Sequence, residues 1–298
     1  MSDSININLP LITIGVSAFN RKDYLKLSLN SLLNQTYPNC EIIVIDDGST
    51  DGTDLMMQEE YPQITYVKQP NGGDASAKNH AARIAKGKYI VFNDSDDLFL
   101  PDSVERLYNA LPKNNKNAIS YGTYQTIDAL GNELPTRRKM DKYPSGNILE
   151  NLLTHIIVNS CGTLIPVDLF NKYNGFDTSL RVCHDYDFFL KLAKDYNFYA
   201  IQEPVFLRRR HGNNLSSASY NKILIANNVF ETFIKNNPDI KNKFPKIVKR
   251  RRANLQNKLY REAKKEKLKL ETKTHAKNAF LLNPTVKSIL KYLLSLIS

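Results

Sequence analysis

The chain has 298 residues, of which 42% are hydrophobic and 24% charged, a composition typical of a folded protein rather than a disordered one. It contains no run of about 18 apolar residues, and Met1 to Pro10 show no basic stretch followed by an apolar one, so we expect neither a membrane-spanning helix nor a secretory signal. Three cysteines without metal-ligand spacing favour free thiols in a reducing compartment, so we expect a cytoplasmic protein.

The net charge of +11 is unevenly distributed along the chain. Residues 1–220 carry a net charge of −3, whereas residues 221–298 carry +14. A partner that is recognised through positive charge is therefore expected at the C-terminal part.

Apolar runs alternate with helical patterns through the first part of the chain. The predicted strands cover residues 11–17, 41–45, 64–67 and 89–92. The predicted helices begin near Asp23 and end before Tyr37, then cover residues 75–85 and 101–111. This alternation predicts parallel strands with helices on both faces of the sheet.

Polar clusters follow three of these strands, at Asn20, at Asp46-Asp47 and at residues 94–97. Ligands of such sheets bind beyond the carboxyl ends of the strands, so we expect a site there. Beyond Tyr121 the pattern is looser, with helices predicted near residues 147–153 and 185–193, strands near 159–165 and 200–207, and basic helices from residue 221.

Four acidic residues lie near the end of the strand at residues 89–92, namely Asp94, Asp96, Asp97 and Asp102. Crowded carboxylates repel one another, and a divalent cation relieves this repulsion. Mg²⁺ and Mn²⁺ prefer carboxylate oxygens and accept phosphate oxygens as further ligands. The alternative is a solvated acidic loop in which Asp97 caps the next helix.

Several motifs, in order and at the right spacing, resemble glycosyltransferase family 2 over about residues 11–216. They are Val16-Ser17-Ala18-Phe19-Asn20-Arg21, residues 31–38, residues 41–53 around Asp46-Asp47-Gly48-Ser49, Asn71-Gly72-Gly73 with Ala77-Lys78-Asn79, and Gly87 to Ile90 with Asn93 to Asp97.

The resemblance implies the GT-A fold, a Rossmann-like mixed α/β sheet flanked by helices, here with a basic helical C-terminal extension. We expect a catalytic domain at 1–220, with a nucleotide-sugar half at about 1–120 and an acceptor half at about 121–220, and an extension at 221–298. It also implies an inverting, Mn²⁺- or Mg²⁺-dependent transfer from a nucleotide-diphosphate sugar, with uridine as the expected base.

Residue roles follow from the resemblance. Phe19 matches an aromatic that stacks on the base, and Asp47 a carboxylate that accepts hydrogen bonds from the nucleoside, while Ser17 and Asn20 line the same edge. The alternatives are core packing for Phe19 and a turn-forming role for Asp46 and Asp47.

The part of the expected site that would bind the diphosphate contains both basic and acidic residues. Lys78 stands where the family often has Arg, and Lys lacks the bidentate fork; the alternative is a surface lysine. Asp94 and Asp96 are expected to hold the metal diphosphate, with Ser95 beside them. Arg210 and His211, followed by Asn214 and Ser216, resemble a later motif in which His ligates the metal and Arg contacts the donor; the alternative is a basic surface loop.

Asp185, in Cys183-His184-Asp185-Tyr186-Asp187, matches the general base that takes the proton of the acceptor hydroxyl, although His184 replaces the usual Glu. The alternative is that Asp185 only caps a helix. Direct attack opposite the leaving diphosphate inverts the anomeric centre. The expected acceptor is a saccharide or a lipid-linked saccharide in surface polysaccharide or glycoconjugate biosynthesis.

The C-terminal segment combines cations with an apolar stripe after Pro284. One hypothesis is an amphipathic helix on the anionic inner face of the cell membrane. The alternative is a helical domain that packs against the catalytic core or a second copy of the chain.

Two other functions compete with glycosyl transfer. A nucleic-acid-binding protein would explain the basic tail but not the acidic clusters, so we expect no nucleic acid. A metal-dependent nucleotidyltransferase would need a glycine-rich basic loop after the first strand, where Ser17-Ala18-Phe19-Asn20 stands.

Overall fold

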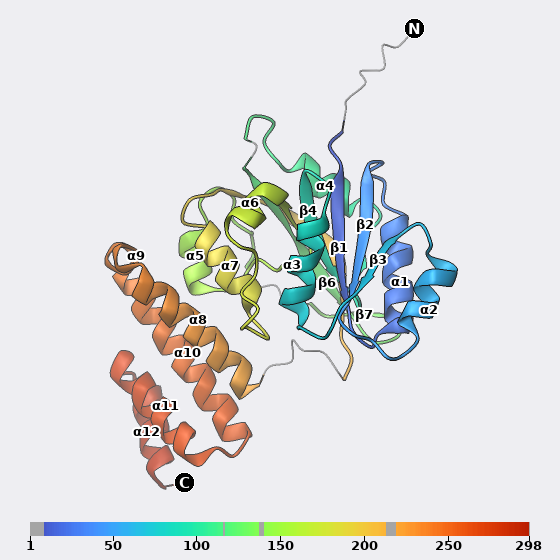
Figure 1. Cartoon of the computed structure of the whole chain (residues 1–298). Coiled ribbons are helices and arrows are strands. Elements are labelled where there is room, and N and C mark those ends of the chain that lie inside the picture. Colours follow the sequence, from blue (N-terminus) through green and yellow to red (C-terminus); the bar gives the residue numbers. More distant parts are fainter. Residues whose placement is uncertain (1–8, 116, 137–139, 213–218, 298) are drawn as a thin grey trace. The chain divides into compact units, whose positions relative to one another are not determined.

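The computed structural model describes residues 9–115, 117–136, 140–212 and 219–297, which form two compact units (Figure 1). The first unit consists of Met1–Gly146, Val158–Arg181 and Tyr196–Gly212, and the second of Asn147–Ile157, Val182–Asp195 and Asn213–Ser298. The units thus interleave along the sequence. The functional boundary expected at residue 220 differs from this division and stays a prediction.

A mixed nine-stranded sheet forms the first unit, with strand order β3-β2-β1-β4-β8-β6-β9-β5 and β7 beside β6. The strands are β1 (Ile12–Ala18), β2 (Cys40–Asp46), β3 (Thr65–Lys68), β4 (Tyr89–Asp94), β5 (Leu98–Phe99), β6 (Ile119–Ile127), β7 (Glu133–Leu134), β8 (Thr163–Pro166) and β9 (Phe198–Arg209). β1 to β4 pair in parallel, whereas β8 runs antiparallel to both β4 and β6. The predicted mixed α/β sheet is therefore confirmed.

Helices cover both faces of this sheet. Successive side chains of β1 point to opposite faces, so each face of the strand packs against different helices. The helices of the first unit are α1 (Lys22–Leu33), α2 (Thr53–Glu60), α3 (Asp74–Ile84), α4 (Ser103–Asn109) and α6 (Val167–Lys172). Ile12, Ile14 and Val16 belong to the same buried apolar cluster as the leucines of α1. On the opposite face α3 lies so close that a Cβ on Gly15 would be 3.1 Å from the Cβ of Ala81.

The second unit is helical. Its helices are α5 (Leu149–Thr154), α7 (His184–Leu192), α8 (Tyr220–Asn236), α9 (Pro238–Lys243), α10 (Pro245–Lys265), α11 (Lys269–Leu282) and α12 (Val286–Ile297). Apolar side chains of α7, α8 and α10 are buried, including Phe189, Phe230 and Leu259 at 0% exposure. The predicted basic helices beyond residue 221 are confirmed.

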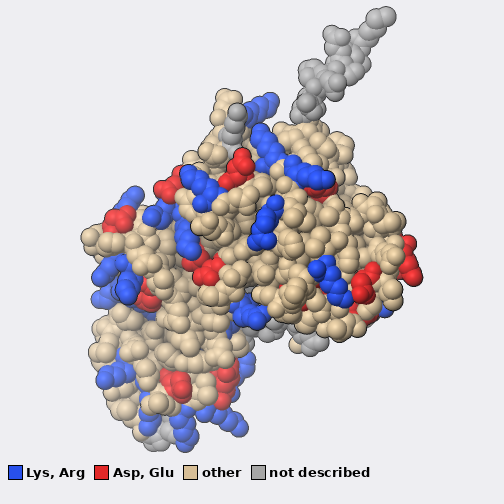
Figure 2. Space-filling model, in the orientation of Figure 1, with Lys and Arg blue, Asp and Glu red and all other residues tan. Residues whose placement is uncertain are grey.

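Charge and apolar surface are both unevenly placed on the second unit. Lysines and arginines are scattered over the C-terminal helices, with a few acidic side chains among them (Figure 2). On α12, four leucines and one isoleucine are 41–57% exposed, namely Ile289, Leu290, Leu293, Leu294 and Leu296. None of the described helices is long and apolar enough to cross a bilayer.

Candidate active site

Three strands bring the predicted polar clusters to one edge of the sheet. β2, β1 and β4 are neighbours and run in parallel, with Ala18 beside Asp46 and Ser17 beside Asp94. The loops after these strands therefore lie next to one another, as expected for a ligand site at the carboxyl ends of parallel strands.

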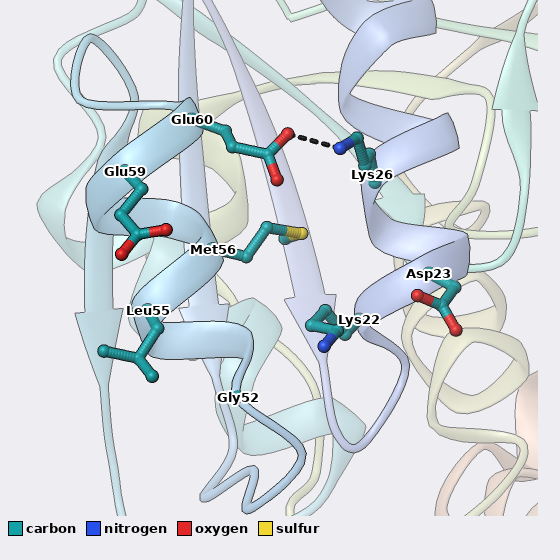
Figure 3. Close-up of a pocket in the computed structure, with 8 residues that line it drawn as sticks. All are labelled: Lys22, Asp23, Lys26, Gly52, Leu55, Met56, Glu59 and Glu60. Carbon is teal, nitrogen blue, oxygen red and sulfur yellow. Dashed lines mark ion pairs between the residues drawn. The ribbon is translucent and has the colours of Figure 1, made fainter.

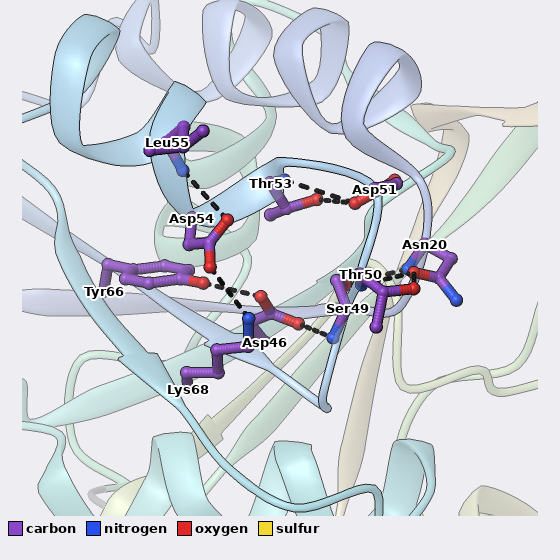
Figure 4. A network of polar contacts seen from close by, with 10 residues as sticks. All are labelled: Asn20, Asp46, Ser49, Thr50, Asp51, Thr53, Asp54, Leu55, Tyr66 and Lys68. Atoms are coloured by element: carbon purple, nitrogen blue, oxygen red, sulfur yellow. Dashed lines mark hydrogen bonds and ion pairs between the residues drawn. The ribbon is translucent and has the colours of Figure 1, made fainter.

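The loops after β1 and β2 are joined by hydrogen bonds (Figure 4). Asp46, fully buried, accepts from the backbone N of Ser49 at 2.7 Å and from the hydroxyl of Tyr66. Asn20 donates its backbone N–H to Ser49 Oγ at 2.9 Å, and its Oδ1 accepts from Thr50 N at 2.8 Å. Asn20 adopts φ of +50°, a left-handed conformation that asparagine tolerates. Asp46 and Asn20 thus fix the shape of this edge.

Asp47 holds the loop that precedes α3. Its Oδ1 accepts from Gln69 Nε2 and from Gly72 N, both at 2.8 Å, and its Oδ2 accepts from Gly73 N at 2.7 Å. The carboxylate is buried, with 4% exposure. Asp47 therefore has a loop-holding role, and its contact with a nucleoside stays a prediction. Phe19, in contrast, is 47% exposed, so it is not part of the core.

Lys78 is buried rather than a surface lysine, because α3 directs it toward β4. Its Nζ lies 2.9 Å from Asp74 Oδ2, 2.7 Å from Asp94 Oδ1 and 3.1 Å from Ser160 Oγ. Burial alone would lower the pKa of Lys78, but the carboxylates of Asp74 and Asp94 raise it above its ordinary value. Ser17 also donates a hydrogen bond to Asp74. Asp74 and Ser160 were not predicted as site residues, since neither belongs to a charged cluster in the sequence.

The acidic cluster at the end of β4 contains three of the four predicted carboxylates. One oxygen from each of Asp94, Asp96 and Asp97 lies within 4.8 Å of the others. Asp97 is buried, and its Oδ1 accepts from Arg209 N at 2.9 Å. Burial, followed by repulsion from Asp94 and Asp96, raises the pKa of Asp97 well above its ordinary value.

Asp102 stands apart from this cluster. It precedes α4 and lies 3.6 Å from Arg106 Nη1 with its side chain 52% exposed. Ser95, between the clustered acids, is buried.

The end of β9 supplies a further ring to the acidic cluster. His211 Nε2 lies 2.8 Å from Asp96 Oδ2, and the His211 ring stacks on Tyr24 with 5.0 Å between centroids. Arg209 donates from Nε to the Asp96 carbonyl at 3.1 Å, and its guanidinium lies 5.2 Å from the Tyr24 ring centroid.

The predicted Arg210 is exposed, so its buried neighbour Arg209 is the arginine beside the cluster. Alternation along β9 turns adjacent side chains to opposite faces, which a motif match alone does not resolve. Asn214 and Ser216 lie outside the described residues.

This donor set fits a divalent cation. Carboxylate oxygens suit Mg²⁺ and Mn²⁺, and an imidazole is a further ligand type for transition metals. The carboxylates of Asp94, Asp96 and Asp97 lie close enough together to repel one another. A cation among these groups would relieve the repulsion between them.

Asp185 lies in the first turn of α7, in the second unit. Cys183 is the residue that precedes the helix, at φ of +65°, and its own side chain makes no capping hydrogen bond. Asp185 Oδ1 accepts from the backbone N of Tyr186 at 2.7 Å, and the side chain is partly exposed. This bond occupies an N–H group of the first turn, so the helix-capping alternative stays open, and the role of Asp185 as a base stays a prediction.

A separate hollow of about 250 Å³ lies between α1 and α2 (Figure 3). Lys26 of α1 and Glu60 of α2 face each other there, with 2.5 Å between Nζ and Oε2. None of the predicted site residues lines it among the described residues. This hollow is thus distinct from the strand-end site.

Residues 13–173 match the family model described as Glycosyl transferase family 2. The chain belongs to this family. An uncharacterized glycosyltransferase of Rickettsia prowazekii (strain Madrid E) is 33% identical over 233 residues, which cover 77% of this chain and 73% of the relative. Chondroitin synthase of Escherichia coli is 33% identical over 211 residues, 70% of this chain but only 30% of that longer protein.

Solved structures share the fold of this family 2 glycosyltransferase. TarS of S. aureus in complex with UDP-GlcNAc matches with a TM-score of 0.60 and 16% identity, over 96% of this chain and 89% of the other. The mannosyltransferase PcManGT from Pyrobaculum calidifontis, in complex with GDP-Man and Mn²⁺, matches with a TM-score of 0.56 and 17% identity, over 97% and 80%. The expected GT-A fold is confirmed.

Proposed function

We propose that this family 2 glycosyltransferase moves a sugar, with inversion, from a uridine-diphosphate sugar to a hydroxyl of a saccharide or lipid-linked saccharide. The observation that carries the proposal is the cluster of Asp94, Asp96 and Asp97 at the end of β4, with His211 beside Asp96. The product would belong to a surface polysaccharide or glycoconjugate, and the similarity to chondroitin synthase supports this class of product.

The donor would bind across the three strand ends. Asp94, Asp96 and His211 would hold a divalent cation, which when bound supplies positive charge to the diphosphate leaving group. The Mn²⁺ and GDP-Man in the PcManGT structure support this choice of cofactor. Ser95 would contact the donor from the end of β4, and Arg209 rather than the predicted Arg210 would support the cluster from the end of β9.

Lys78 would act on the donor chiefly through Asp94. Its Nζ is already 2.7 Å from Asp94 Oδ1, so it orients this carboxylate and adds positive charge near the diphosphate. Phe19, with its ring 47% exposed, would stack on the base, while Ser17, Asn20 and Asp47 shape the edge that receives the nucleoside.

Asp185 would take the proton from the acceptor hydroxyl as that oxygen attacks the anomeric carbon. Its match to the family motif and its partly exposed carboxylate at the start of α7 support this role. A single displacement opposite the leaving diphosphate inverts the configuration.

The activity is tested with a panel of UDP- and GDP-sugars, each with Mn²⁺, with Mg²⁺ or with EDTA. We expect hydrolysis of one or a few UDP-sugars that requires the divalent cation. Release of sugar 1-phosphate rather than of a nucleoside diphosphate would instead indicate the nucleotidyltransferase alternative, because nucleotidyl transfer breaks the bond between the two phosphates. Turnover that is equal with Mn²⁺ and with EDTA would contradict the metal assignment.

The exposed apolar side of α12 would bring the enzyme to the inner face of the cell membrane. Leu290 and Leu294 are 57% and 52% exposed and four residues apart on the same side of the helix, and Lys291 lies between them in the sequence. The test is flotation with anionic vesicles of the chain carrying Leu290→Ser and Leu294→Ser. The matched control carries Leu270→Ser and Leu281→Ser, which alter leucines of α11 that are 74% and 63% exposed. Equal flotation of the two variants contradicts the role of α12.

A further inference from the structure

The second unit contains a cavity of about 430 Å³, and none of the residues assigned to the proposed donor site is among its described lining residues. It is formed by the end of α5, one side of α10, and the segment from α11 into α12. Its lining residues are polar or charged: Thr154, His155, Arg251, Asn254, Asn257, Lys258, Arg261, Asn283, Thr285, Ser288 and Lys291. Its volume is within the range of small-molecule sites.

The side chains that line this cavity include several cations. Four of its lining side chains are cationic, Arg251, Lys258, Arg261 and Lys291, and among the described lining residues none is acidic. Arg252, which does not line the cavity, is by contrast paired with Glu231 at 2.6 Å. Partial burial and the charges of Arg251 and Arg261 lower the pKa of Lys258. An anion would therefore reduce the repulsion between these groups.

Arg251 forms the fixed wall of the cavity. Its side chain is 4% exposed, and Nη1 donates to the Thr154 carbonyl at 2.7 Å. The guanidinium lies 5.8 Å from the ring centroid of Tyr186 and 6.0 Å from that of Phe230. Its buried Nε has no hydrogen-bond partner among the described residues. These contacts fix the orientation of Arg251, so its positive charge is held at the wall of the cavity.

The remaining lining groups suit an oxygen-rich ligand. Lys291 Nζ donates to Asn257 Oδ1 at 2.7 Å, which links α12 to α10 across the cavity. The side chains of Asn254 and Asn283 add amide donors. Guanidinium, ammonium and amide donors together match the oxygens of phosphate, which accept several charge-assisted hydrogen bonds at once.

We infer that this cavity binds the phosphate group of a ligand, through Arg251, Lys258, Arg261 and Lys291. The inference goes beyond the proposed glycosyl transfer, because none of these residues belongs to the donor or base assignments. The phosphate is either that of a lipid headgroup or that of a soluble molecule, and the volume leaves room for an organic part next to it.

Binding is tested by calorimetric titration of inorganic phosphate into the full chain, with EDTA present and without nucleotide so that the donor site stays silent. The test variant carries Lys258→Gln and Arg261→Gln, which remove two exposed cations of the lining and leave the buried Arg251 in place. The matched control carries Lys246→Gln and Lys249→Gln, two exposed lysines with the same spacing on α10 that do not line the cavity.

We expect the wild type and the control to bind alike, and the test variant to bind about tenfold more weakly or worse, as expected for lost charge-assisted contacts. Circular dichroism confirms that both variants fold. Equal binding by all three proteins, or an equal loss in the control, overturns the inference.

Two further arms identify the source of the phosphate. Glycerol 3-phosphate serves as the soluble ligand, and vesicles containing phosphatidic acid serve as the membrane ligand. Vesicle binding that is weakened only in the test variant indicates a lipid headgroup, whereas weakened binding of glycerol 3-phosphate with unchanged vesicle binding indicates a soluble ligand. If the wild type binds neither of these ligands nor inorganic phosphate, the inference is wrong.

Discussion

His211 Nε2 lies 2.8 Å from Asp96 Oδ2, although 115 positions separate the two residues in the chain. The antiparallel pairing of β5 with β9 causes this contact. Leu98 is opposite Leu207, so the residues just before β5 meet those at the end of β9. Beyond this pair, Arg209 N donates to the side chain of Asp97, which adds a second contact between the two segments. The two-residue strand β5 thus completes the proposed metal site.

Because Asp96 contacts His211, replacing Asp96 is the most direct test of the proposed metal site. We expect Asp96→Ala to lower metal-dependent donor hydrolysis by about 100-fold or more, because it removes a proposed ligand whose cation stabilises the leaving group. Asp102→Ala is the matched control, since Asp102 is an exposed acid outside the cluster. Turnover is measured over a range of Mn²⁺ concentrations. A similar effect of the two substitutions would remove the distinction between the cluster and its surroundings.

Lys78 is expected to stabilise the fold. Lys78→Met leaves Asp74 and Asp94 facing each other without their shared cation, and such a loss from a buried pair costs about 3 kcal/mol or more. Because the Asp94 side chain is 41% exposed, we expect the lower end of that range. The free energy of unfolding is measured in urea.

The control for Lys78 is Lys68→Met, which removes the same charge from an exposed pair. Lys68 Nζ lies 2.9 Å from Asp54 Oδ2, with both side chains more than 40% exposed. Exposed pairs contribute about 1 kcal/mol or less. If Lys68→Met destabilises the chain as much as Lys78→Met, burial is not the reason for the effect of Lys78.

The sequence predicts the strand-end clusters well because they follow strong apolar strands. Apolar runs in the sequence predict β1, β2 and β4, which are largely buried. The ends of these strands, and with them Asn20, Asp46 and Asp94, can therefore be located from the sequence. The position of α2 was not predicted. It has only eight residues and begins after Gly52 at φ of +83°, with Thr53, Met56 and Met57 as its buried side chains. So short a helix has no long apolar stripe.

Partners that are distant in sequence are harder to predict than strand ends. The contact of Lys78 with Ser160 spans 82 positions and depends on β8 lying beside β4 in antiparallel order. No local pattern encodes that neighbour. Likewise, the loop-holding role of Asp47 depends on the backbone N–H groups of Gly72 and Gly73, which a motif match does not reveal.

The proposed role of Asp185 as the base is tested by a substitution that keeps the shape of the side chain. We expect Asp185→Asn to leave donor affinity within about twofold and to lower transfer by roughly 100-fold to 10,000-fold, because an amide does not accept the hydroxyl proton. Asp187→Asn is the control on the same turn, where Asp187 pairs with Lys191 at 2.5 Å. Donor affinity is measured by calorimetry and transfer with a saccharide acceptor. Full transfer by Asp185→Asn removes the base assignment.

His275 is expected to make the stability of the chain depend on pH. The side chain is buried, Nδ1 lies 2.7 Å from Gln256 Oε1, and Nε2 lies 3.0 Å from the Tyr220 hydroxyl. A neutral ring fits this arrangement, donating from Nδ1 and accepting at Nε2. Burial lowers the pKa of His275 below its ordinary value of 6.5, and the opposing effect of Glu271 is smaller.

Protonation therefore favours the unfolded chain, in which the histidine keeps its ordinary pKa. The stability that His275 contributes is present above pH 6.5 and is lost as the pH falls through that value toward the lower pKa of the folded state. We compare the free energy of unfolding of the wild type and of His275→Gln, at about pH 7.5 and about pH 5.5. The advantage of the wild type should shrink at the lower pH, because glutamine does not titrate. An unchanged advantage would mean that folding does not shift the pKa of His275, which contradicts the prediction. A larger advantage at the lower pH would mean that the folded protein favours the charged ring, and the hydrogen bonds to Gln256 and Tyr220 would then have to be reassigned.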